Sequence, residues 1–219
     1  MAPMAKQLTL LDPPPALARE VALARLDALV GADLRPLADD HGITVWREGK
    51  RNKGWAGQTV ERLLGQRPNS IQAADFGDWE LKVVPLALTA DGQLRLKETM
   101  AITMFTEADL ETQAFEESHL LAKLERIVVV GRVYEDATES RSLVAMVVPF
   151  DLSDPALREQ VRADYDEIRW VVRQHGAYAL DARLGRLVQP RPKGAGQFRG
   201  GHGFYARKAF VEHMLGLPT

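Results

Sequence analysis

A nearly continuous run of Val and Ile at residues 127–133 is the feature that most constrains the fold of this chain. Branched side chains favour strands, and a strand that is apolar at consecutive positions is typical of one with both faces buried. Residues 143–148 predict a second strand soon after it. We therefore expect a central sheet whose inner strand is covered on both sides.

Composition limits the functional classes. The chain has 219 residues, of which 46% are hydrophobic, enough for one sizeable core. It has no cysteine, which excludes a disulfide framework, a thiolate zinc site and a cysteine nucleophile. The five histidines lack the spacing of a helical metal pair. No apolar run is long enough to cross a bilayer and no signal peptide is evident, so we expect a cytoplasmic protein.

Periodicity predicts several elements. A helix should begin near Ala16, after three consecutive prolines, because apolar residues then recur at steps of three and four. Alternating apolar residues at 94–104 predict a strand. Asp154 followed by Pro155 predicts the start of a long helix. The apolar stripe of the first helix, which we expect to be buried, consists of Leu17, Val21, Leu23, Leu26, Leu29 and Val30.

A short segment at residues 75–82 carries candidate chemistry. Side chains on a strand alternate between its faces, so Glu80 and Lys82 should share one face. Asp75, just ahead of this strand, is placed to join Glu80 in holding a hard divalent cation, with Lys82 close enough to neutralise charge on a phosphate. Glu61, on a predicted preceding helix, is placed to reach the same metal. The plainer alternative is a solvated strand edge with a surface glutamate nearby.

Charge is distributed unevenly along the chain. Residues 183–208 contain seven Lys or Arg and no Asp or Glu, so this segment carries +7 and the remainder −9. A basic strip on an otherwise acidic protein indicates a surface that binds a polyanion. The alternative is a solvated loop with a biased composition.

Five blocks of sequence resemble, in order, the MutH family of mismatch-repair endonucleases. They span about residues 50–210, which makes the resemblance far more specific than any single block. The blocks are Lys53-Gly-Trp-Ala-Gly with Glu61, Asp75-Phe with Glu80-Leu-Lys82 and Pro85, Phe115-Glu-Glu-Ser-His119 with Lys123, Arg191-Pro-Lys193, and Gly203-Phe-Tyr205.

The resemblance implies an α/β fold of the restriction-endonuclease-like type, the PD-(D/E)xK superfamily. In this fold a mixed β-sheet is flanked by helices, and DNA lies in a cleft between two arms. The whole chain, 1–219, would form one domain. Residues 1–15 would be a flexible leader, 16–110 the arm with the metal site and 111–219 the arm that recognises DNA.

The resemblance also implies roles for individual residues. Asp75, Glu80 and Glu61 would hold Mg²⁺, for which Mn²⁺ would substitute. Lys82 would be the catalytic lysine, and Lys123 a basic residue near the scissile phosphate.

One departure from the family affects this site. The segment between Asp75 and Glu80 is shorter than in the family, which makes Asp78 a competing metal ligand.

The resemblance implies DNA contacts for six residues. Arg191 is placed to contact guanine in the major groove, because guanine presents two acceptors there. Tyr205 is associated with sensing adenine methylation, and its alternative is a half-buried aromatic residue ahead of the last helix. The full set is Lys53, Arg191, Pro192, Lys193, Gly194 and Tyr205.

The implied function is nicking of the unmethylated strand at hemimethylated GATC sites. The implied partners are double-stranded DNA and MutL, with MutS acting through MutL, and we expect a monomer with no membrane association. The nearest alternative is a type II restriction endonuclease of the same fold that cuts both strands without repair partners. A non-enzymatic DNA-binding relative is the more distant alternative, because all four residues of the candidate catalytic set are present at 61, 75, 80 and 82.

Overall fold

A computed structural model of the chain describes residues 17–66, 74–192 and 201–218. Within these ranges no helix is both long and apolar enough to cross a membrane. The strands are β1 (Trp46–Arg47), β2 (Lys50–Arg51), β3 (Glu80–Leu88), β4 (Leu94–Leu96), β5 (Met100–Phe105), β6 (Arg126–Tyr134), β7 (Ser142–Asp151), β8 (Val188–Pro192) and β9 (His202–Ala206). The α-helices are α1 (Arg19–Asp27), α2 (Leu34–Asp40), α3 (Trp55–Leu63), α4 (Glu107–Thr112), α5 (His119–Leu124), α6 (Pro155–His175) and α7 (Lys208–Met214).

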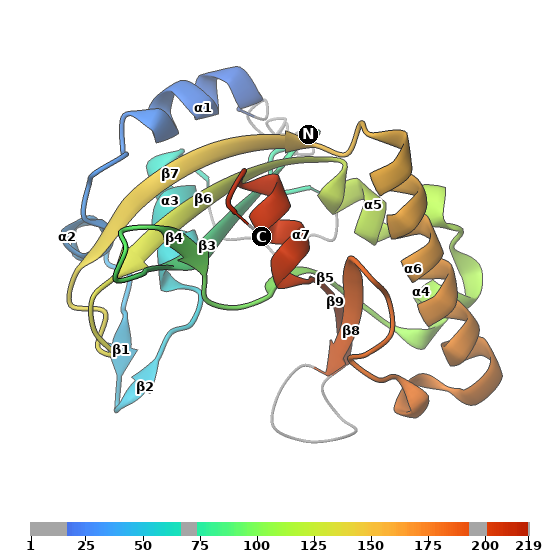
Figure 1. Cartoon of the computed structure of the whole chain (residues 1–219). Coiled ribbons are helices and arrows are strands. Elements are labelled where there is room, and N and C mark those ends of the chain that lie inside the picture. Colours follow the sequence, from blue (N-terminus) through green and yellow to red (C-terminus); the bar gives the residue numbers. More distant parts are fainter. Residues whose placement is uncertain (1–16, 67–73, 193–200, 219) are drawn as a thin grey trace, which may run out of the picture.

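The central sheet has the strand order β4-β3-β6-β7 and forms the arch in Figure 1. β3 and β6 are parallel, whereas β4 and β7 run antiparallel to their neighbours, so the sheet is mixed. Ile127 and Val129 of β6 belong to one hydrophobic cluster, and Val128 and Val130 belong to another. The prediction that this strand is buried on both faces is therefore confirmed.

The two clusters give the molecule two layers around the central sheet. The cluster that contains Val128 and Val130 joins α1, α2 and α3 to one face of the sheet. The cluster that contains Ile127 and Val129 joins the opposite face to α5, α6, α7 and a three-stranded sheet of order β5-β9-β8. The expected mixed sheet flanked by helices is confirmed. The layers do not divide at one point in the chain, because β6 contributes to both clusters and β5 lies in the second sheet although it precedes residue 110.

The buried stripe predicted for the first helix is wrong at two positions. Val21 is 46% exposed and Val30, beyond the end of α1, is 50% exposed, whereas Leu26 is fully buried. A charged residue takes the place of an apolar one, since the Arg19 guanidinium donates to Asp151 Oδ1 at 2.6 Å and to the Ile127 carbonyl at 3.0 Å. The helix is thus anchored to the sheet by arginine hydrogen bonds as well as by apolar packing.

The single strand predicted at residues 94–104 is also corrected, because it is divided between two sheets. β4 pairs with β3 in the central sheet, and β5 pairs with β9 in the small sheet. The chain changes sheets between Leu96 and Met100, next to a hydrogen bond from the Lys97 N–H to the Pro85 carbonyl at 3.0 Å. An alternating pattern continues through such a change because both strands bury one face.

The long helix begins where the sequence predicts. Asp154 caps α6, and its carboxylate accepts hydrogen bonds from the N–H groups of Ala156 and Leu157, with Pro155 at the first helical position. Because these N–H groups have no partner within the helix, the cap stabilises its first turn.

Candidate active site

The first residue of β3 is the most deeply buried charge of the candidate site. Glu80 has no exposed surface, and its Oε1 accepts a hydrogen bond of 2.6 Å from Lys82 Nζ. Lys82 Nζ also donates to the Ile102 carbonyl at 3.0 Å, so this ammonium group is held from two sides. The contact confirms that Glu80 and Lys82 share one face of the strand.

A second lysine enters the site from α5. Lys123 Nζ lies 3.2 Å from Asp75 Oδ1 and 3.1 Å from each carboxylate oxygen of Glu80. The Asp75 N–H donates to Glu80 Oε2 at 3.0 Å. Two lysines therefore balance two carboxylates, which matters because a buried charge without a partner is strongly destabilising.

The short turn before β3 decides which aspartate enters the site. Phe76 and Trp79 are fully buried and stack with ring centroids 4.1 Å apart, and the Trp79 indole N–H donates to the Leu17 carbonyl at 2.9 Å. This anchoring directs Asp75 toward Lys123. Asp78 instead forms an ion pair with Arg126 and has a side chain that is 65% exposed. Of the two competing aspartates, the structure therefore brings only Asp75 to Glu80.

A pocket of about 340 Å³ opens beside this cluster. Burial raises the pKa of Glu61, and the nearby charges of Asp75 and Glu80 raise it further, against the opposing charges of the two lysines. Glu61 and Asp75 both line this pocket, and the buried Glu80 lies next to it, where it accepts the hydrogen bond from the Asp75 N–H. The pocket is lined by Gly54, Gly57, Gln58, Glu61, Asp75, Leu81, Lys82 and Val83.

The donor set has the chemistry of a hard-cation site. Carboxylate oxygens are the ligands that Mg²⁺ prefers. The pKa of Glu61 is raised first by burial and then by the charges of Asp75 and Glu80, and a cation would favour its ionised form. The cation that now bridges Asp75 and Glu80 is the Lys123 ammonium. As they are placed, no three acidic or histidine side chains in the described ranges form a group that could hold a metal ion.

Two groups of this site were not predicted from the sequence. Gln58 lines the pocket three residues before Glu61, and helical spacing was the signal that could have identified it. The Ile102 carbonyl that holds Lys82 comes from β5, and nothing in the local sequence indicates that contact.

Comparison with known proteins supports the resemblance over the segment that carries this site. The family model described as DNA mismatch repair enzyme MutH matches residues 64–164. A DNA mismatch repair protein MutH from Shewanella sp. (strain MR-4) is 28% identical over 212 residues, covering 88% of this chain and 92% of its own length. Its counterpart from Shewanella baltica (strain OS185) is 29% identical over 178 residues, covering 79% of this chain and 77% of its own.

These comparisons confirm that the chain resembles the MutH family, whose model matches residues 64–164. They also support the DNA endonuclease class that the resemblance implied. Among solved structures, a complex of restriction endonuclease MvaI with its cognate DNA substrate is similar with a TM-score of 0.37 and 14% identity, over 90% of this chain and 97% of that one.

The residues that the MutH resemblance assigns to base recognition meet on the small sheet. Arg191 pairs with Gly203 across β8 and β9, and its guanidinium carbon lies 5.9 Å from the centre of the Tyr205 ring. Arg191 is exposed and Tyr205 is half-buried. A side chain at Gly203 would lie about 3.0 Å from the Met104 sulfur, so glycine allows the close approach of β9 to β5. We refer to β8 and β9 as the base-recognition strands.

The other predicted DNA contacts lie partly outside the described residues. Pro192 ends β8 and is exposed, while Lys193 and Gly194 lie outside the described residues. Lys53 is exposed in the turn before α3, one residue before the pocket-lining Gly54.

Proposed function

We propose that this protein is a Mg²⁺-dependent endonuclease of the MutH family that nicks the unmethylated strand at hemimethylated GATC sites. It would act as a monomer in methyl-directed mismatch repair, activated by MutL, with MutS acting through MutL. The observation that carries the proposal is the assembly of Asp75, Glu80, Lys82 and Lys123 beside one pocket that Glu61 also lines. These groups come from three segments of the chain, around residues 61, 75–82 and 123, and each group suits phosphodiester hydrolysis.

Asp75, Glu80 and Glu61 are the residues that would hold the ion. When bound, Mg²⁺ supplies Lewis-acid stabilisation of the phosphate and lowers the pKa of a coordinated water. Support for this fit comes from the oxygen donors themselves and from the raised pKa of Glu61, which is due first to burial and then to the charges of Asp75 and Glu80. Mn²⁺ would substitute, because it also accepts carboxylate oxygen ligands.

The lysines supply positive charge where the phosphate gains negative charge. Lys82 Nζ keeps one hydrogen bond to Glu80 and one to the Ile102 carbonyl, so its ammonium is oriented before DNA arrives. An oriented donor needs little reorganisation during the reaction, which is the basis of electrostatic catalysis. Lys123, which contacts both Asp75 and Glu80, would add a second positive charge near the scissile phosphate.

Strand choice would depend on the base-recognition strands. A methyl group on adenine N6 projects into the major groove, where Tyr205, packed beside Arg191, would accept an amino group and clash with its methylated form. Arg191 would contact guanine, because its guanidinium suits the two acceptors of that base.

A strand-labelled nicking assay tests the proposal on unmethylated, hemimethylated and doubly methylated forms of one GATC duplex, with and without MutL. We expect nicking of the unmethylated strand only, resistance of the doubly methylated duplex and stimulation by MutL. Tyr205→Ala should reduce the difference between methylation states more than it reduces total cleavage. Equal cutting of all three duplexes would exclude the methyl-directed role, and cutting of both strands without MutL would favour a restriction enzyme.

A further inference from the structure

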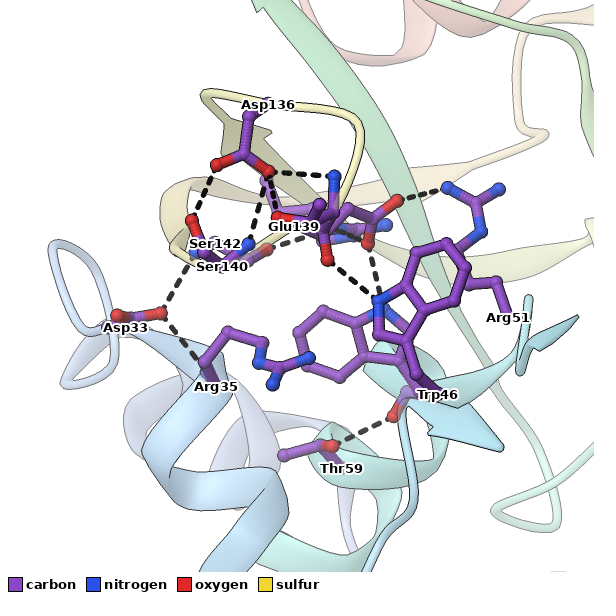
Figure 2. Close-up of polar contacts among 12 residues, drawn as sticks. Asp33, Arg35, Trp46, Arg51, Thr59, Asp136, Glu139, Ser140 and Ser142 are labelled. Carbon is purple, nitrogen blue, oxygen red and sulfur yellow. Dashed lines mark hydrogen bonds and ion pairs between the residues drawn. The ribbon is translucent and has the colours of Figure 1, made fainter. Parts of the chain in front are cut away.

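A second buried carboxylate lies outside the active-site pocket. Glu139, in the turn between β6 and β7, has no exposed surface. It forms an ion pair with Arg51 of β2, and its Oε2 accepts hydrogen bonds from the Trp55 indole N–H at 2.8 Å and from Arg132 at 2.9 Å. Figure 2 shows Glu139 at the centre of this network, with Arg51 and Trp46 close by. One carboxylate therefore connects β2, the start of α3 and β6.

The turn that carries Glu139 is held in an uncommon backbone conformation. Glu139 has a φ of 52°, in the left-handed region that residues other than glycine seldom adopt. The Asp136 side chain accepts hydrogen bonds from the N–H groups of Thr138 at 2.8 Å and Ser140 at 3.4 Å, and these bonds fix the turn. Such strain persists only where the surrounding contacts outweigh it.

The hairpin formed by β1 and β2 is attached to this turn at two points. Besides the Arg51–Glu139 pair, the Trp46 indole N–H donates to the Thr138 carbonyl at 2.8 Å. Trp46 is itself 42% exposed, so this hydrogen bond lies at the surface and fixes the hairpin without being part of the core. In Figure 1 the hairpin extends from the underside of the arch, the side to which β8 and β9 also extend.

The tip of the hairpin carries charge that the protein does not neutralise well. Arg47 and Lys50 are exposed and lie directly opposite each other across the two strands, and like charges in this position repel. Arg47 approaches Glu48 only at 3.9 Å, with both side chains 84% exposed. Lys53 adds a third exposed cation just beyond β2. A polyanion would relieve the repulsion at this tip.

The hairpin is also connected to the pocket. Asn52 follows β2, and its side-chain amide donates to Gln58 Oε1 at 3.0 Å and to the Thr44 carbonyl at 3.1 Å. Gln58 lines the pocket on the same helix as Glu61. Trp55, which Glu139 holds, begins that helix. Glu139 therefore fixes the hairpin and the helix of the catalytic pocket relative to each other.

We propose that residues 46–53 form an arm that contacts DNA phosphates and that Glu139 is the positioning residue of this arm. The inference rests on the proposed nuclease function and identifies a second region of its DNA-binding surface. Phosphate contacts place a protein on the duplex without reading sequence, so the arm sets where the backbone lies relative to the pocket. Glu139 itself does not touch DNA.

A double-mutant cycle for DNA binding tests this arm. Lys50→Ala removes an exposed cation, and Glu139→Gln removes the charge that holds the hairpin, so both should weaken binding of a labelled duplex in EDTA by about fivefold at low salt. If Glu139 acts through the hairpin, Lys50→Ala should weaken binding less than about twofold in the Glu139→Gln background. If Glu139 is only a stability residue, the two losses multiply, and that result overturns the proposal.

Trp46→Phe gives a second route should Glu139→Gln fail to fold. It removes the surface hydrogen bond to Thr138, keeps an aromatic side chain although a smaller one, and changes no charge, and the same coupling with Lys50→Ala is expected. Arg25→Ala is the matched control, because Arg25 is an exposed cation on α1, away from the hairpin in Figure 1, and should leave binding unchanged. An effect of Lys50→Ala no larger than that of Arg25→Ala overturns the arm, even in a protein that nicks GATC normally. Absence of nicking in the wild type would instead contradict the proposed function.

Discussion

The active-site pocket and the base-recognition strands each depend on a buried carboxylate, but the two carboxylates have different partners. Glu80 is met mainly by the side chains of Lys82 and Lys123, with one further hydrogen bond from the Asp75 N–H. Asp164 of α6 is met mainly by the backbone, since it accepts hydrogen bonds from the N–H groups of residues 186, 187 and 188 at 2.6 to 2.8 Å. These residues lead directly into β8, which carries Arg191.

The difference separates a site that can change partners from a scaffold that cannot. The ion pairs of Lys82 and Lys123 with Glu80 can change by rotation of the lysine side chains alone. Backbone N–H groups at residues 186–188 can leave Asp164 only if the chain itself moves. The candidate metal site thus depends mainly on side-chain contacts, whereas the path of the chain into β8 depends on backbone hydrogen bonds.

The largest effect is expected from substitutions in the active-site pocket. We expect Asp75→Asn and Glu80→Gln each to reduce cleavage at least about a thousandfold while preserving the fold, because each removes a ligand oxygen charge from the pocket. The measurement is nicking of supercoiled plasmid with Mg²⁺ or Mn²⁺, with circular dichroism to establish folding. Asp78→Asn is the matched control, since Asp78 pairs with Arg126 outside the pocket, and it should change the rate less than about twofold. Cleavage in EDTA, or full activity in either pocket variant, would contradict the metal-site assignment.

The sequence predicted those parts of the molecule whose signals are local. The double burial of residues 127–130 follows from a run of branched residues, and the start of α6 follows from Asp154 and Pro155. The shared face of Glu80 and Lys82 follows from the period of a strand. Each of these features depends on residues within a few positions of one another.

Features that depend on distant partners were not predictable in the same way. Arg19 is buried because Asp151 and carbonyl groups of the central sheet receive it, and the sequence around Arg19 contains no trace of them. Glu139 was missed because two of its partners are distant in sequence: Arg51 is 88 positions away and Trp55 is 84 positions away. Its third partner, Arg132, gives no local signal of the contact. Residues 94–104 kept their alternation while the chain changed sheets, so a period of two could not show the break.

An intermediate effect is expected when the hydrogen bonds between Asp164 and the backbone of residues 186–188 are weakened. Asp164→Asn replaces one acceptor oxygen by an amide that faces backbone donors, and we expect a loss of about 2–3 kcal/mol of unfolding free energy. Discrimination between GATC and altered sites should fall by about tenfold, because the start of β8 would no longer be held, while the rate on the best site changes less. Denaturant unfolding and competition cleavage measure the two quantities.

Asp166→Asn is the matched control for Asp164→Asn. Asp166 is exposed two residues further along the same helix, so removing its charge should alter neither stability nor discrimination appreciably. A loss of stability in Asp164→Asn without any loss of discrimination would show that β8 keeps its path without this carboxylate, and the comparison between the two halves would fail.

The smallest effect, and the one with an opposite sign, is expected at Glu61. Burial, followed by the charges of Asp75 and Glu80, raises the pKa of Glu61 above its usual value of 4.5, so the ionised form is less favourable in the folded protein than in the unfolded chain. The stability associated with the protonated form is complete below pH 4.5 and is lost as the pH rises through the pKa of the folded state. Glu61→Gln should therefore raise the melting temperature in EDTA by about 2 °C near neutral pH, the shift expected for less than 1 kcal/mol in a chain of this size. The gain should shrink as the pH falls toward and below 4.5, because protonation of Glu61 in the wild type removes the unfavourable charge, and the same variant should lose cleavage with Mg²⁺. A variant that is less stable at neutral pH would mean that Glu61 makes favourable contacts outweighing the repulsion, and the carboxylates would then not be held together against their mutual charge.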